Sequence, residues 1–71
     1  MDFERVSSST IAGVGYDPTT STLGIRFHSG SEYHYFDVPE ELYNGLVSAP
    51  SVGRYFHEHV KKTGYAYRKV R

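Results

Sequence analysis

Residues 11–38 read IAGVGYDPTTSTLGIRFHSGSEYHYFDV, and this stretch decides the fold. Three runs rich in β-branched and aromatic residues, at 11–16, 22–27 and 32–38, are separated by two turn sequences. The first turn contains Asp17-Pro18, in which Asp can bond the backbone ahead and Pro pre-sets φ. The second turn contains Ser29-Gly30. The stretch therefore predicts a three-stranded antiparallel meander.

The first of these strands has two unlike faces. Ala12, Val14 and Tyr16 share one face, while Gly13 and Gly15 share the other. Two glycines on one face indicate that another element of the chain approaches the backbone closely there.

The register of the third strand against the second stays open. The second strand points three side chains inward: Leu23, Ile25 and Phe27. A two-residue loop at residues 29–30 pairs Ile25 with His34 and leaves Tyr33 and Tyr35 beside Arg26 on the open face. A bulged three-residue loop pairs Ile25 with Tyr35 and brings both tyrosines into the core. The two registers place these tyrosines on opposite faces because a slip of one residue turns every side chain over.

Helical signals follow the meander. Pro39 suits the first position of a helix that runs to Ala49 at the furthest, since Pro50 stops it. Ser51 is a candidate N-cap for a second helix over residues 52–63, with Gly64 as its terminator. We expect residues 1–9 to form a loosely ordered N-terminal segment and residues 10–71 a single α+β domain. This domain is a small three-stranded antiparallel meander followed by two helices, with residues 65–71 as a candidate short edge strand.

Composition excludes several classes of protein. The chain of 71 residues has no Cys, which excludes disulfides, thiolate zinc sites and cysteine nucleophiles. It is too short for a two-domain enzyme with a deep cleft. Its mean hydropathy is −0.52, and no apolar run approaches the roughly 18–20 residues of a membrane span. The N-terminus lacks the order of a signal peptide, so the expectation is a soluble cytoplasmic protein without membrane contact.

Charge is distributed unevenly along a chain whose formal net charge is zero. Residues 1–50 hold two of the 8 basic residues and seven of the 8 acidic ones, and residues 51–71 hold the remainder. A basic end on a neutral chain suggests a polyanionic partner. The alternative is that both halves fold together and their charges neutralise one another across the surface.

An ordered set of short motifs resembles a known family. The motifs are Gly15-Tyr16-Asp17, Phe27 with Gly30, Tyr33-His34-Tyr35, Val38-Pro39-Glu40, Gly53-Arg54-Tyr55-Phe56 and Tyr65-Ala66-Tyr67. Together they resemble the KTSC domain, which occurs alone in bacterial and phage proteins and at the C-terminus of some lysyl-tRNA synthetases. The resemblance covers about residues 7 to 70. It implies an expectation of RNA binding, and it carries over no catalytic residue.

The residues themselves also favour a non-catalytic, weak RNA-binding module. Tyr33 and Tyr35 project from one face of a strand about 7 Å apart, a spacing that suits stacking on successive unpaired bases. Basic side chains of the C-terminal segment would contact phosphates. The predicted contact residues are Tyr33, Tyr35, Arg26, Arg54, Lys61, Lys62, Tyr65, Tyr67, Arg68, Lys69 and Arg71, and the expected partner is tRNA or single-stranded RNA.

The sequence gives less support to metal binding and to catalysis than to RNA binding. His57 and His59 point about 200° apart on a helix, so they cannot share one metal, and we expect no metal and no cofactor. Glu32, His34 and Arg26 on adjacent strands are a candidate set for a small ribonuclease. The same three residues make an ordinary cross-strand charge arrangement, and we expect no enzyme activity.

The alternative function is a protein-interaction module. Seven Tyr in so small a domain are more than a core accommodates easily, and Tyr is enriched at protein interfaces. A protein partner, or homodimerisation through the open sheet face, would also explain them. The expected state is a monomer or a weak homodimer.

Overall fold

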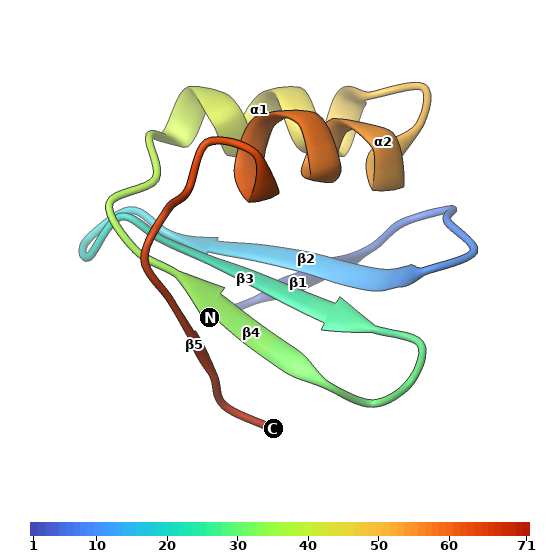
Figure 1. Ribbon diagram of the computed structural model, residues 1–71, viewed down its shortest axis with the longest axis horizontal. Helices are drawn as coiled ribbons and strands as arrows, with labels where there is room; N and C mark the ends of the chain where they lie inside the picture. Colours follow the sequence, from blue (N-terminus) through green and yellow to red (C-terminus); the bar gives the residue numbers. More distant parts are fainter.

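The computed structural model describes residues 1–71 as one antiparallel sheet covered on one face by helices (Figure 1). The sheet has five strands in chain order: β1 (Phe3–Arg5), β2 (Ile11–Asp17), β3 (Thr22–Phe27), β4 (Glu32–Tyr35) and β5 (Tyr67–Lys69). The helical segments are α1 (Glu40–Ser48), α2 (Val52–Phe56) and η1 (His57–Lys61). The α+β class, the central meander and the C-terminal edge strand predicted from the sequence are confirmed.

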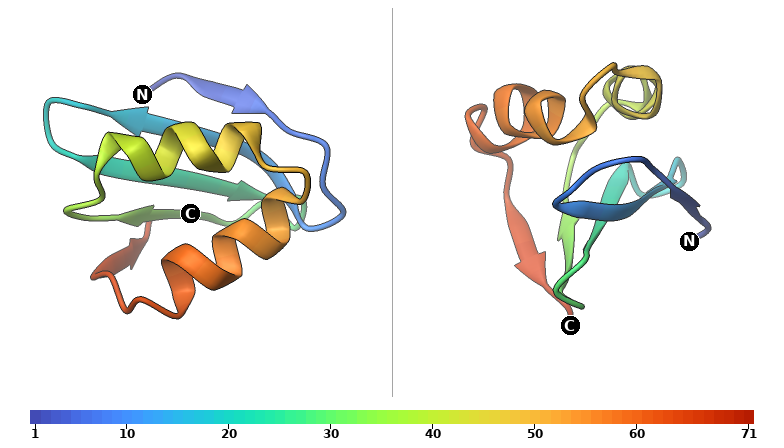
Figure 2. Two further views of the ribbon diagram at one scale, coloured as in Figure 1. Left: turned by 90° about the horizontal axis from the view of Figure 1, so that it is seen from above. Right: turned by 90° about the vertical axis from the view of Figure 1, so that its right-hand side faces the viewer.

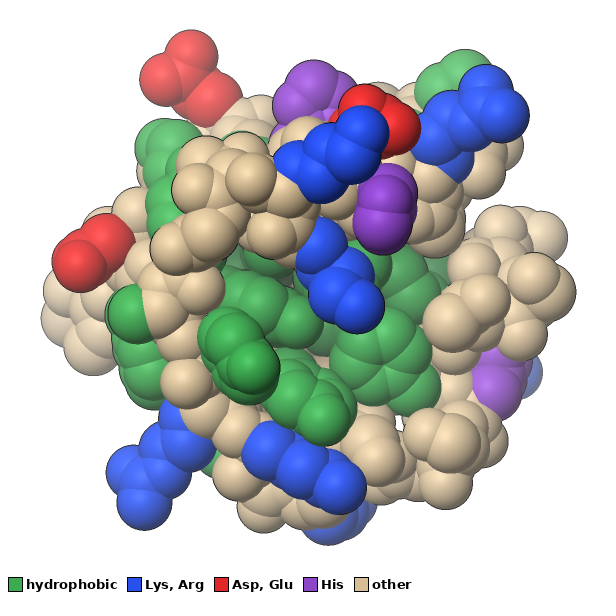
Figure 3. All heavy atoms as spheres, viewed as in Figure 1, with side chains coloured by type: hydrophobic (Ala, Val, Ile, Leu, Met, Phe, Trp, Pro, Cys, Tyr) green, Lys and Arg blue, Asp and Glu red, His purple; other side chains and the backbone are tan.

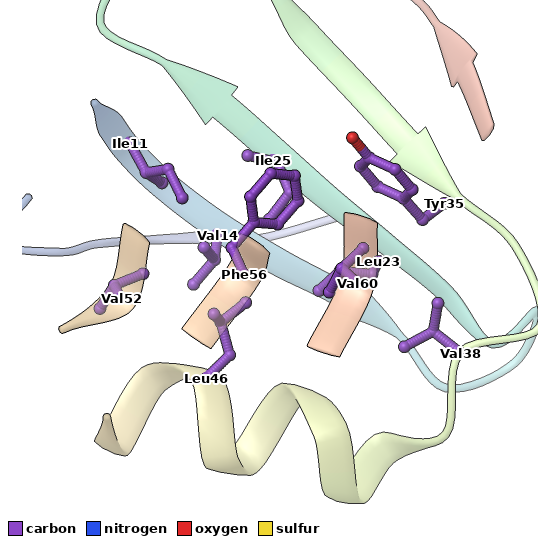
Figure 4. Packing of buried hydrophobic residues seen from close by; sticks show 10 residues of the cluster. All are labelled: Ile11, Val14, Leu23, Ile25, Tyr35, Val38, Leu46, Val52, Phe56 and Val60. Carbon is purple, nitrogen blue, oxygen red and sulfur yellow. The ribbon is translucent and has the colours of Figure 1, made fainter. Parts of the chain in front are cut away.

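The core lies between the sheet and the two helices (Figure 2). Alternate residues of β2, β3 and β4 point toward the helices, because successive side chains of a strand face opposite sides. Figure 4 shows these side chains meeting those of α1, α2 and η1. The buried hydrophobic residues are Ile11, Val14, Leu23, Ile25, Tyr35, Val38, Leu46, Val52, Phe56 and Val60. No helical segment has the length and apolar character needed to cross a bilayer.

Phe27 and Ser31 close the β3–β4 hairpin around a loop of three residues, 28–30. The N–H of Phe27 donates to the carbonyl of Ser31 at 2.9 Å, and the N–H of Gly30 donates to the carbonyl of Phe27 at 2.9 Å. Gly30 has a φ of 98°, a conformation that side chains disfavour. The resulting register pairs Ile25 with Tyr33.

This register corrects both predicted pairings. The observed pairing is shifted by two residues from the bulged alternative, which paired Ile25 with Tyr35. Because a shift of two residues leaves each side chain on the same face, the structure has the side-chain facing that the bulged alternative predicted. Tyr33 and Tyr35 therefore lie on the core face with Leu23 and Ile25, and the reading that put them beside Arg26 on the open face is wrong.

A bulge in β2 changes the predicted facing of its first residues. The pairing with β3 shifts between Ile11 and Gly13, so the regular alternation is interrupted at Ala12. Ile11 and Val14 are both fully buried as a result, whereas Ala12 is half-buried. In a strand without the bulge, Ile11 and Val14 would lie on opposite faces of the sheet.

The N-terminal segment, which we expected to be loosely ordered, contains a strand at residues 3–5. β1 pairs with β2, with Phe3 opposite Gly15. A Cβ at Gly15 would lie 2.7 Å from the carbonyl oxygen of Asp2, and one at Gly24 would lie 2.7 Å from Cζ of Phe3. The predicted close approach to the glycine face of β2 is confirmed, and β1 with its preceding residues is the element that makes it.

The second helical stretch begins where the sequence predicts, at Val52, whereas α1 begins one residue later than predicted, because Pro39 is its extended N-cap and not its first residue. Ser51 caps α2, because its Oγ accepts the N–H of Arg54 at 3.3 Å. The predicted single helix over residues 52–63 instead changes from α2 into the π-helical turn η1, in which the N–H of Lys62 donates to the carbonyl of His57 at 3.1 Å. Gly64, with a φ of 86°, follows this helical stretch and turns the chain toward β5.

We predict that Gly15→Ala destabilises the protein by about 1–3 kcal/mol, because the new methyl group meets backbone that must shift. Urea unfolding followed by circular dichroism measures the effect. Gly53→Ala is the control: its Cβ would meet only Oγ of Ser8 at 3.6 Å, and it replaces a helical glycine, so stability should be unchanged or slightly higher. Equal effects of the two substitutions would refute the close approach of β1.

Candidate functional site

A groove with a volume of about 420 Å³ lies between the β4–β5 edge of the sheet and the end of η1. Five of its lining residues are aromatic, and the full lining is Phe27, Ser29, Ser31, Tyr33, Tyr35, Val60, Lys61, Gly64, Tyr65 and Tyr67. Figure 3 shows hydrophobic side chains gathered in front of the sheet and below the helices, with Lys and Arg side chains around them. We call this feature the tyrosine groove.

Strand pairing builds the aromatic wall of the tyrosine groove. Tyr35 is paired with Tyr67 across β4 and β5, and their ring centroids are 5.6 Å apart. Tyr33 lies 6.5 Å from Tyr35 and 5.9 Å from Tyr67. On its inner side Tyr35 meets Phe56 of the core at 5.5 Å, in an edge-to-face contact. The wall therefore runs continuously from the core to the surface.

Exposure changes steeply along this wall. Tyr35 is 6% exposed, whereas Tyr67 is 63% exposed and Tyr33 and Tyr65 are half-buried. Tyr35 is thus a floor residue held by packing, and Tyr67 is a rim residue whose ring meets solvent. Removal of Tyr67 from the rim should therefore leave the core intact.

The hydroxyl groups of the groove have no partner within the chain. Tyr16, outside the groove, donates its hydroxyl to the carbonyl of Val38, but no intrachain hydrogen bond involves the hydroxyl of Tyr33, Tyr35, Tyr65 or Tyr67. Burial raises the pKa of Tyr35 to about 12, with smaller contributions from Tyr33 and Tyr67. Its phenol therefore stays protonated and can both donate and accept a hydrogen bond.

Two lysines flank the tyrosine groove. Lys61 lines it directly from η1. Lys69 is opposite Tyr33 in the pairing of β4 with β5, and residues directly opposite one another share a face of the sheet. Lys62 instead lies 3.7 Å from Glu58 on the helical surface. The groove thus combines aromatic rings with two positive charges at its margin.

Three of the predicted basic residues lie on the opposite face, around a buried carboxylate. Oε1 of Glu32 is 2.8 Å from Nε of Arg26 and 3.5 Å from Nη2 of Arg71, and its Oε2 is 2.8 Å from Nε2 of His34. Arg68 is opposite His34 in the pairing of β4 with β5. We call Arg26, Glu32, His34, Arg68 and Arg71 the outer-face cluster.

The pKa of Glu32 is lowered despite its burial. The hydrogen bond from Arg26 lowers it most, burial opposes this, and His34 and Arg71 lower it further. An ionised carboxylate only accepts hydrogen bonds, so Nε2 of His34 carries its proton. The candidate ribonuclease set of Glu32, His34 and Arg26 is thus in contact, with the carboxylate already bonded to the two other groups.

The sequence-predicted contact residues therefore divide among separate surfaces. Tyr33, Tyr35, Lys61, Tyr65 and Tyr67 line the tyrosine groove, and Lys69 flanks it. Arg26, Arg68 and Arg71 belong to the outer-face cluster. Arg54 lies apart, where it lines two other hollows beside Pro50 and Ser51. One continuous surface built from all of these residues does not exist.

Sequence reasoning missed several lining residues of the groove. Phe27 was predicted only to point inward and Val60 was not singled out as a site residue, and both form groove wall. Ser29, Ser31 and Gly64 are turn residues whose place in the groove depends on how the β3–β4 loop and the end of η1 approach one another. No sequence signal marks that approach. The structure contains no group of three His, Cys, Asp or Glu residues that could hold a metal ion.

These features define a small α+β domain with an aromatic groove at one edge of its sheet. The sequence model of the KTSC domain matches residues 7–70 of the chain. The chain therefore belongs to the KTSC domain family.

Individual relatives agree with this assignment. The crystal structure of a KTSC domain protein from Yersinia pestis superposes with a TM-score of 0.89 at 38% identity, over 99% of this chain and 97% of that one. A protein from Stutzerimonas stutzeri is 37% identical over 65 residues, which are 92% of each chain.

Lysine–tRNA ligases form a second group of relatives. The ligase from Nostoc sp. is 49% identical over 57 residues, which are 80% of this chain but 10% of the ligase. The chain thus spans about a tenth of the length of the ligases that it matches.

We predict that Glu32→Gln lowers the free energy of unfolding by about 1.5–3 kcal/mol near neutral pH, because it weakens charge-assisted hydrogen bonds. The pKa of Glu32 is lower in the folded protein than in the unfolded chain. Its contribution is therefore present above the usual Glu range and is lost as the pH falls through the folded-state pKa. The difference between the two proteins should accordingly shrink below about pH 4.5.

Urea unfolding at a series of pH values checks this prediction. Glu58→Gln is the matched control, because the Glu58–Lys62 pair is exposed and should contribute less than about 1 kcal/mol. A difference between Glu32→Gln and wild type that stays constant into acid would contradict the assignment of the stabilising charge to Glu32.

Proposed function

We propose that this domain is a non-catalytic module that binds single-stranded RNA weakly, and that it does so by accepting an unpaired base in the tyrosine groove. The observation that carries the proposal is the meeting of four tyrosines and a lysine, Tyr33, Tyr35, Tyr65, Tyr67 and Lys61, around one hollow. Single strands are held by aromatic surfaces together with positive charge, and this groove offers both.

The shape of the groove favours one inserted base over a row of stacked bases. Its volume of about 420 Å³ is near the lower end of the range of small-molecule sites, roughly 300–1,000 Å³. Tyr35 forms the floor, so a base cannot stack on both Tyr33 and Tyr35 as on a flat sheet. The exposed ring of Tyr67 is the platform that a base reaches first.

Polar groups of the groove suit the edge of a base and its phosphate. The unpartnered tyrosine hydroxyls both donate and accept, which matches the mixed donors and acceptors of a base edge. Lys61 and Lys69 supply positive charge for the adjacent phosphates. The relatives among lysine–tRNA ligases support an RNA partner, since those proteins act on tRNA. Binding of RNA would in turn imply a cytoplasmic location for this domain.

A protein interface is the second candidate function. Tyr67 and Val70 are exposed hydrophobic residues at the free edge strand β5, and such an edge can pair with another chain. Lys69 and Arg68 on the same strand oppose that pairing, because like charges would meet across a symmetric contact. The RNA reading is therefore preferred, and self-association becomes an outcome of its test.

We predict that Tyr67→Ala weakens binding of single-stranded RNA by about 5- to 150-fold, the equivalent of about 1–3 kcal/mol of stacking. Its dependence on salt should not change, because no charge is removed. Lys61→Gln should instead reduce the slope of log affinity against log salt by about 0.7, the value for one phosphate contact on a single strand. Titrations of isotope-labelled protein with tRNA and short single-stranded RNA, followed by NMR at about 50 and 200 mM salt, measure both effects.

Matched variants make this test specific. Tyr67→Phe keeps the ring and should bind nearly as wild type does, and Lys62→Gln removes a lysine outside the groove. Absence of groove shifts at about 50 mM salt, where electrostatic binding is strong, would refute RNA binding. A concentration-dependent dimer that Tyr67→Ala abolishes would establish the protein interface in its place.

A further inference from the structure

The outer-face cluster lies across the sheet from the tyrosine groove. We infer that it is a second binding site, specific for phosphate groups, and that it holds the backbone of the same RNA strand whose base enters the groove. This inference rests on the proposed function for the source of the phosphate. The chemistry of the site itself rests on the side chains of the cluster.

Glu32 organises the cluster as a positioning residue. It is 6% exposed, and its two oxygens hold Arg26, His34 and Arg71 in place from three different parts of the chain. Without the carboxylate the guanidinium groups of Arg26 and Arg71 would repel one another. Glu32 thereby pre-orders side chains that would otherwise lose conformational entropy on binding a ligand.

The arginines keep most of their donors free. A guanidinium has five N–H donors, and the bond to Glu32 uses only Nε of Arg26. The Arg71 side chain is 69% exposed. The Arg26 side chain is 44% exposed, and its guanidinium carbon lies 3.8 Å from the centroid of the Phe3 ring, so one face of this group is covered while its edge faces outward. Forked guanidinium groups match the geometry of a phosphate better than lysine does.

Charge balance favours an anion at this site. Arg26, Arg68 and Arg71 provide three positive side chains, and Glu32 is the only carboxylate within ion-pair distance of any of them. Arg68 has no ion-pair or hydrogen-bond partner within the chain, although its neighbours in the cluster do. If the cluster served only to hold the end of the chain against β4, the contacts of Arg26 and Arg71 with Glu32 would be explained. The position of Arg68 beside them, without a partner, would not be.

The edge strand β5 connects the two sites. Tyr67 and Lys69 face the groove, and Arg68 between them faces the outer cluster, because neighbouring residues of a strand point to opposite faces. All three residues are exposed, and β5 is the last strand of the sheet. A single strand of RNA can therefore pass around this edge, with a base on one face and a phosphate on the other.

The test compares three probes on the full chain: the nucleoside uridine, a single-stranded octanucleotide and inorganic pyrophosphate. We expect Arg68→Gln to weaken octanucleotide binding about eightfold at about 50 mM salt and to reduce the salt slope by about 0.7. It should leave the affinity for uridine, which has no phosphate and reaches only the groove, unchanged. Lys62→Gln is the control, an exposed basic residue outside both sites.

NMR shifts separate the outcomes. Shifts of residues 26, 34 and 68 with the octanucleotide, and their reduction in Arg68→Gln, would support the inference. If the octanucleotide perturbs the groove alone and Arg68→Gln binds it as wild type does, the outer site is refuted while the proposed function stands. If pyrophosphate perturbs the outer face and neither uridine nor the octanucleotide binds, the phosphate site stands and the proposed function is refuted. If no probe perturbs the outer face, the inference is overturned.

Discussion

The hydrogen bonds by which Phe27 closes the three-residue loop with Ser31 and Gly30 set the register of β3 and β4, and both candidate sites depend on that register. With Ile25 opposite Tyr33, every odd-numbered residue of β4 faces the helices and every even-numbered one faces away. A loop shorter by one residue would exchange the two sets. It would place Glu32 among apolar side chains, where an unpaired carboxylate is costly, and would move the tyrosines to the open face. The buried carboxylate and the aromatic wall therefore enforce the same pairing.

Glu32 has a place in both the fold and the chemistry of the molecule. Its backbone exchanges hydrogen bonds with Val70 and Arg71, which hold the end of the chain beside β4, and its side chain gathers the cationic groups on the outer face. Taking a carboxylate out of water is unfavourable unless it is paired and hydrogen-bonded. Here Arg26 and His34 supply those bonds at 2.8 Å, so a buried carboxylate that would destabilise the fold without partners instead stabilises it.

The sequence predicted the parts of the fold that depend on local signals. Alternation identified β2, β3 and β4, Pro39 and Ser51 marked the helix starts, and the tail was identified as an edge strand. Features that depend on distant contacts were missed. β1 has no alternation of its own, and its Phe3 packs on Gly15 and Gly24, which lie 12 and 21 residues away in sequence. The bulge at Ala12 and the exact loop of the β3–β4 hairpin also gave no clear signal.

The sequence predicted which types of residue form the candidate site but not how they are arranged in space. Charge counting placed Lys61, Lys69, Arg68 and Arg71 in one basic segment, but strand alternation and helix direction distribute them over two faces. Tyr33 and Tyr35 looked equivalent in sequence, yet packing against Phe56 makes Tyr35 a floor and leaves Tyr33 nearer the opening. Such differences arise from tertiary packing, which periodicity cannot report.

The shortness of β5 has a further consequence for how the domain would respond to a ligand. A three-residue edge strand with every side chain exposed belongs to the least protected part of a fold, and such segments open locally at a small fraction of the global unfolding free energy. Opening of this strand removes Tyr67 from the groove wall and Arg68 from the outer-face cluster in one event. A ligand that binds β5 on either face would thus favour the closed state of this strand. Binding on one face would therefore strengthen binding on the other through the ordering of three residues, without a structural change elsewhere in the sheet.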